Sequence, residues 1–153
     1  MSRFWLFVHL LGFTMWLGGG LAAMMAGIAA KRESRTGLAA VVRAQSAVYR
    51  IVIGPGALLA VLSGLILTLG AGTSGLGDQY GMNVWLMIMQ GAGLIGALLV
   101  LFIAVPVSAR LVRVEAEGQG AGYFDELRNR LRVVGMVHGT LALLALVAGA
   151  MVR

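Results

Sequence analysis

The chain has 153 residues, of which 59% are apolar and only 12% are charged, and its mean hydropathy is +0.91. These values exclude an ordinary soluble domain and indicate a single membrane domain over residues 1–153. The absence of cysteine excludes disulfides, thiolate metal sites and covalently attached haem. The net charge of +6 comes from cations beside apolar runs, where they set membrane topology, so we expect no nucleic-acid partner.

The first apolar run covers residues 4–30 and is long enough to cross a bilayer, since about 1.5 Å per residue gives about 40 Å of helix. Along it His9, Gly12, Trp16 and Gly19 recur at steps of three and four, so they share one helical face. We predict that this face looks into the protein, because an imidazole facing lipid is costly. His9 is therefore a candidate ligand or redox residue, and the alternative is a simple hydrogen bond to a helix carbonyl.

An amphipathic segment follows from Ser34, with Leu38 and Val42 on its apolar side and several arginines on the other. We expect a surface helix that runs into a second span over residues 51–72. Pro55 is expected to kink or start that helix, because proline lacks a backbone donor. The glycine-rich stretch 71–81 contains no lysine or arginine and is predicted to be a loop.

The third span is predicted over residues 83–106. Its inner strip is expected to contain Trp85, Met89 and Gly93, which recur at helical spacing and would meet the first span. Met87 lies at a similar depth as a further soft donor, although methionine is more often an ordinary filler of apolar cores.

A short amphipathic helix on the membrane surface is predicted over residues 123–132, before a fourth span over 133–152. The fourth span contains His138 inside the motif Gly135 to Gly139, a pattern typical of close helix packing. The fold class is therefore all-α: a transmembrane four-helix bundle with short amphipathic cytoplasmic helices.

Ten of the twelve cations lie in two segments, residues 31–50 and 107–132. The positive-inside rule places both segments in the cytoplasm and both termini outside, for a protein of the cytoplasmic (inner) membrane. Helix rise then places His9 about 9 Å and His138 about 22 Å below the outer surface. One haem held by both histidines is disfavoured, and Met89, level with His9, is the first-choice partner.

A family resemblance is carried by His9, Gly12 and Trp16 in the first span, Tyr49, Pro55 and Gly56 around the start of the second, and Trp85 and Leu86 in the third. In these residues the chain resembles the small four-helix HemJ and CopD-like membrane proteins, over roughly residues 4–113. HemJ is a haem-binding protoporphyrinogen oxidase, and CopD-like proteins are linked to copper. The resemblance implies that His9 is the functional histidine. It also places Met89 where the family has a functional lysine, which argues against the same oxidase activity.

Two functions are compatible with these patterns. The first is a b-type haem protein, with an oxidoreductase acting on a porphyrin or quinone-type small molecule as its enzymatic form. The second is a non-enzymatic protein that handles copper or another small solute. Acidic residues lie outside the predicted spans, so no hydrolase constellation is present. Small-residue strips on the third and fourth spans would allow a homo-oligomer in the lipid bilayer. The expected cofactor-binding residues are His9, Gly12, Trp16, Gly19, Trp85, Met89 and Gly93, and the metal ligands His9 and Met89, with Met87 and His138 as weaker candidates.

Overall fold

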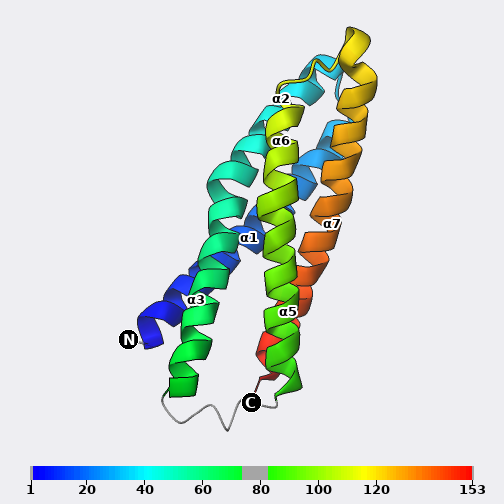
Figure 1. Cartoon of the computed structure of the whole chain (residues 1–153). Coiled ribbons are helices and arrows are strands. Elements are labelled where there is room, and N and C mark those ends of the chain that lie inside the picture. The colour runs from blue at the N-terminus through cyan, green and yellow to red at the C-terminus, as the bar shows by residue number, and fades with distance from the viewer. Residues whose placement is uncertain (1, 74–82, 153) are drawn as a thin grey trace.

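The computed structural model describes residues 2–73 and 83–152, and the regular structure in these ranges is entirely helical. Figure 1 shows a bundle of long helices, as the sequence predicts. The helices are α1 (Ser2–Ala29), α2 (Arg35–Val48), α3 (Gly54–Thr73), α5 (Val84–Leu99), α6 (Val105–Leu111) and α7 (Ala121–Met151). Two single π-helical turns, Tyr49–Ile53 and Val100–Ala104, join α2 to α3 and α5 to α6. The chain therefore forms four continuous rods, each long and apolar enough to cross a membrane.

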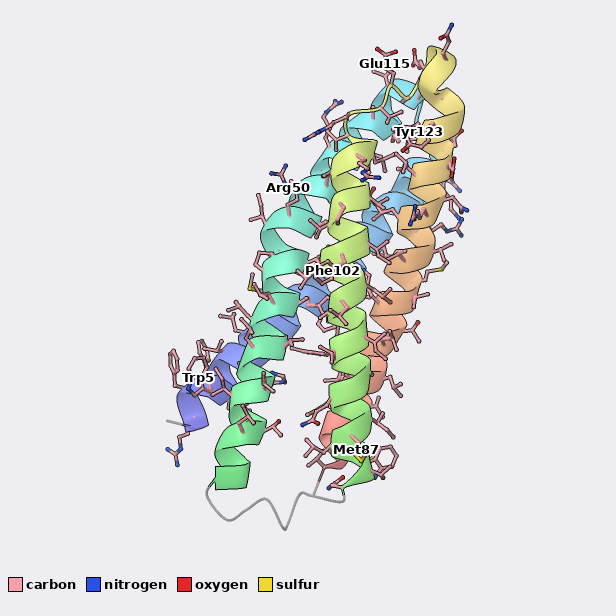
Figure 2. The ribbon with its side chains drawn as sticks, viewed as in Figure 1. Trp5, Arg50, Met87, Phe102, Glu115 and Tyr123 are labelled. Atoms are coloured by element: carbon pink, nitrogen blue, oxygen red, sulfur yellow. The ribbon has the colours of Figure 1, made fainter. Side chains whose placement is uncertain are left out.

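The rods pack chiefly as two pairs. Helix α1 packs along α3, and α5 packs along α7, while smaller contacts between α1 and α7 join the pairs. Figure 1 shows the start of α1 and the end of α7 at one end of the bundle, with α2 and the start of α7 at the other. Figure 2 places Trp5 and Met87 toward the first end, and Arg50, Glu115 and Tyr123 toward the second. The two ends thus differ in charge as the cation count predicts.

The outer surface of the bundle is apolar. Phe7 on α1 is 63% exposed and Phe102, labelled in Figure 2, is 72% exposed. Many of the buried residues are small. Ala57, Ala97 and Ala142, for example, are at most 2% exposed. A soluble monomer rarely exposes large contiguous apolar surface, whereas lipid makes such an exterior favourable. The exposed side chains therefore fit a protein that sits in a membrane.

The second rod is continuous from the surface helix into the span, in agreement with the sequence prediction. The helix runs through Pro55 without ending. A π turn makes this possible: the N–H of Gly54 donates to the carbonyl of Tyr49, five residues earlier. Such a turn takes up the disturbance that a proline ring causes in the preceding turn. An equivalent bond joins Val105 to Val100 just before Pro106.

The fourth rod differs from the prediction of a separate surface helix over residues 123–132. Helix α7 continues from Ala121 to Met151 without a break. Its buried face passes from Phe124, Leu127 and Leu131 directly into His138 at helical spacing, so one face packs against the bundle throughout. No proline occurs within α7, and Gly135 does not end the helix.

Backbone contact between α1 and α3 sets the closest crossing in the bundle. A Cβ atom on Gly12 would lie 2.7 Å from the backbone nitrogen of Ala60 and 2.8 Å from the carbonyl oxygen of Gly56. A Cβ atom on Gly56 would in turn lie 2.7 Å from the backbone nitrogen of Trp16. Any side chain at either position would force the two helices apart. The glycines are required by packing.

Replacing Gly12 with alanine should therefore destabilise the protein by about 1–3 kcal/mol, because the added methyl group meets backbone rather than a flexible side chain. Gly18→Ala is the matched control, since open space surrounds the Cα of Gly18 and alanine favours the helix. The free energy of unfolding in mixed detergent micelles measures both. Equal effects of the two substitutions would contradict the close crossing.

Candidate functional site

A tryptophan and a histidine meet in the centre of the bundle. Trp16 on α1 is 1% exposed and His138 on α7 is 2% exposed. The indole Nε1–H of Trp16 donates to Nδ1 of His138 at 3.3 Å. Tyr49, in the π turn, approaches the imidazole edge-to-face with ring centroids 6.1 Å apart. Three of the four rods therefore contribute an aromatic or imidazole ring to one buried cluster.

Glycines on the facing helices make room for these rings. A Cβ atom on Gly96 of α5 would lie 2.9 Å from the indole ring of Trp16. One on Gly135 of α7 would lie 3.1 Å from the hydroxyl oxygen of Tyr49. A large side chain on one helix thus fills the space that a glycine leaves on the next, and the centre is closely packed.

The hydrogen bond from Trp16 determines which ring nitrogen of His138 carries the proton. An indole nitrogen can only donate, so Nδ1 of His138 must accept and must carry no proton. The neutral imidazole then holds its proton on Nε2. That atom is buried and has no hydrogen-bond partner in the described part of the chain. A histidine binds a metal through an unprotonated nitrogen, so this tautomer does not suit His138 to be a ligand.

His9 has the opposite arrangement. Its Nδ1 lies 2.7 Å from the carbonyl oxygen of Ala60 on α3, and a carbonyl can only accept. Nδ1 of His9 therefore carries the proton, and Nε2 keeps a free lone pair. The hydroxyl oxygen of Ser63 lies 3.4 Å from the same Nδ1 atom and gives it a second polar neighbour. Gly64 leaves room for the ring, because a Cβ atom there would lie 3.1 Å from Cε1 of His9.

The bond to a helix carbonyl was the simple alternative to a ligand role for His9, but the two are compatible. Metal-bound histidines usually donate their other ring N–H to a carbonyl or carboxylate, which orients the ring and fixes the tautomer. His9 already has this arrangement. His9 is also only half-buried, whereas His138 is enclosed.

The glycines of the first span serve a different purpose from the one expected. Gly12 contacts the backbone of α3, and a Cβ atom on Gly19 would lie 2.8 Å from Cγ1 of Ile53 in the π turn. The second rod fills the space beside these two glycines, so a macrocycle cannot lie against them. Trp16 is likewise committed to His138 and Gly96. Among the expected cofactor-binding residues of α1, only His9 presents a free polar atom.

Met89 of the third span does not contact His9. Met89 packs on α7, where a Cβ atom on Gly149 would lie 3.0 Å from its Sδ atom. Because α1 pairs with α3 and α5 pairs with α7, the contacts of His9 and of Met89 lie on different helix pairs. Met87 is 65% exposed and Trp85 is 41% exposed, so neither lies in the interior. The first and third spans meet at Trp16 and Gly96, but the contact does not bring Met89 or Trp85 to His9.

Two features of the site were missed by the sequence interpretation. Ser63 and the Ala60 carbonyl, which hold His9, lie in the second span, whereas the sequence pattern predicts a partner, Met89, in the third. A serine within an otherwise apolar run was the available signal. Gly93, the remaining predicted cofactor residue, has open space over its Cα atom. Within residues 2–73 and 83–152, no three His, Asp or Glu side chains come together as a metal cluster would require.

Substitution of Trp16 by phenylalanine should cost about 1–3 kcal/mol of stability, because Nδ1 of His138 is then buried without a donor. In a His138→Leu background the same substitution should cost far less, which gives a coupling of about 0.5–3 kcal/mol in a double-mutant cycle. Trp5→Phe, near the end of the bundle, is the control and should have little effect. Additive effects of the Trp16 and His138 substitutions would refute the bond.

No protein-family model, curated protein or solved structure matches this chain. The resemblance to HemJ and CopD-like proteins therefore rests on the residues quoted above. Of these, His9 bonds to the Ala60 carbonyl through Nδ1, while Gly12, Trp16 and Gly56 are explained by helix packing. The function must be argued from the chemistry of His9.

Proposed function

We propose that this chain is an integral protein of the cytoplasmic membrane that binds a b-type haem through Nε2 of His9. One observation carries the proposal: the Nδ1–H of His9 donates to the Ala60 carbonyl at 2.7 Å and leaves Nε2 with a free lone pair. The cation distribution supports an orientation with both termini outside and the end that carries α2 in the cytoplasm.

The donor set favours a site with one ligand from this chain. His138 is unsuited to a second position because its Nε2 carries the proton. Met89 lies against Gly149 on the other helix pair. We therefore propose His9 as the single haem ligand from this chain, in place of the expected pair of His9 and Met89. Ala60 and Ser63 would orient the ligand ring, and their bonds to Nδ1 would raise the basicity of Nε2.

A haem at His9 would supply one-electron iron chemistry, so we propose a redox function. The resemblance to HemJ suggests a porphyrin or quinone-type molecule as the reacting partner. The HemJ reaction itself is disfavoured, because Met89 stands at the position of that family's lysine and a thioether cannot donate a hydrogen bond.

His9→Ala should remove the Soret absorption of protein purified after haem-replete expression, because the ligand is lost. Met89→Leu is the matched control: it keeps the side-chain volume and should leave both the spectrum and the haem content unchanged. The haem-to-protein ratio and the absorption spectrum measure the result.

Several outcomes separate the alternatives. A wild-type protein without a Soret band that retains copper after purification would favour the copper-handling function. A band that persists in His9→Ala would refute the ligand assignment. A spectrum altered by Met89→Leu would restore methionine as the second ligand.

A further inference from the structure

A cavity of about 240 Å³ lies at the cytoplasmic end, between α2, the segment after α6 and the start of α7. Its floor is apolar and formed by Val42, Leu111 and Phe124, all of them buried. Arg43 and Arg113 line it from two different rods. The cavity thus combines an apolar floor with two guanidinium groups.

The two arginines are free to bind an anion. Within the described ranges, neither Arg43 nor Arg113 forms an ion pair. Arg35, about two turns earlier on α2, is already occupied, since it donates two hydrogen bonds to the carboxylate of Asp125 at 2.9 and 3.0 Å. Guanidinium groups match phosphate geometry and can bind it through two parallel hydrogen bonds.

The cavity lies at the level expected for lipid headgroups. The rod Val84–Leu111 has 28 residues, which corresponds to about 42 Å at 1.5 Å per residue. A bilayer with its headgroup regions is about 40–45 Å thick. With Trp85 at one interface, Leu111 therefore reaches the headgroups of the opposite leaflet. Val112, which also lines the cavity, is 39% exposed and offers apolar surface beside it.

We infer that this cavity binds the phosphate of an anionic phospholipid headgroup from the cytoplasmic leaflet. Basic pockets at the cytoplasmic ends of membrane helices favour such headgroups. Glu115, the acidic residue in the lining, opposes an anion but leaves a net positive lining beside the two arginines. The inference goes beyond the proposed function and requires only that the bundle spans a membrane; it does not depend on haem.

Native mass spectrometry of the full chain, released from micelles that contain equal amounts of phosphatidylglycerol and phosphatidylcholine, tests the site. Wild-type protein should retain one phosphatidylglycerol in preference to phosphatidylcholine. Arg43→Gln combined with Arg113→Gln should lower that retention at least about tenfold, because two charge-assisted hydrogen-bonding groups are lost. Arg130→Gln, an exposed arginine on α7 outside the cavity, is the matched control and should retain the lipid.

Further variants keep the test decisive. Arg43→Lys combined with Arg113→Lys preserves the charge and the fold and should give intermediate retention. Glu115→Gln should increase phosphatidylglycerol retention by removing a repulsive charge. The site is refuted if the double glutamine variant retains lipid like wild type, if Arg130→Gln loses as much, or if Glu115→Gln weakens binding. Displacement of the lipid by millimolar inorganic phosphate would show a free-phosphate site and overturn the lipid assignment.

Discussion

The crossing of α1 and α3 through Gly12 and Gly56 is the constraint on which the rest of the bundle depends. Backbone contact at this point brings the carbonyl of Ala60 within reach of His9 and directs Trp16 toward the opposite pair of helices. Lipid offers no hydrophobic drive for helices to associate, so close backbone packing and interhelical hydrogen bonds must hold them. This crossing has both, in the backbone contact and in the bond from His9 to the Ala60 carbonyl. Its loss would disturb both histidine environments at once.

The two histidines show how one residue type acquires two chemistries. His9 faces a carbonyl and keeps its Nε2 lone pair, whereas His138 faces an indole N–H and must carry its proton on Nε2. Neither tautomer requires a charged neighbour. In a nearly dry interior, the donor or acceptor character of one partner decides the tautomer, because an unmatched pair would leave two like groups facing each other. The partner of each histidine therefore decides whether it can be a ligand.

The sequence predicts four apolar helices, their charge asymmetry and an inward position for His9, since these follow from composition and helical period. The pairing of the helices could not be predicted, because glycine strips on every span allow several neighbours. The first and third spans meet at Trp16 and Gly96, yet Met89 lies against Gly149 of the fourth span. Pro55 is expected to kink or start a helix, and the structure has a π turn at Tyr49–Ile53 just before it. The tautomers depend on contacts between distant residues, such as Trp16 and His138, which no local pattern reveals.

The opposite tautomers of His9 and His138 are the central claim, and ¹⁵N NMR of histidine-labelled protein prepared without haem tests it most directly. Protonated and unprotonated ring nitrogens differ widely in ¹⁵N shift, and a His138→Leu sample assigns the two signals. The account predicts a proton on Nδ1 of His9 and on Nε2 of His138. The same tautomer at both residues, or a proton on Nε2 of His9, would contradict the account and remove the basis for a ligand at this position.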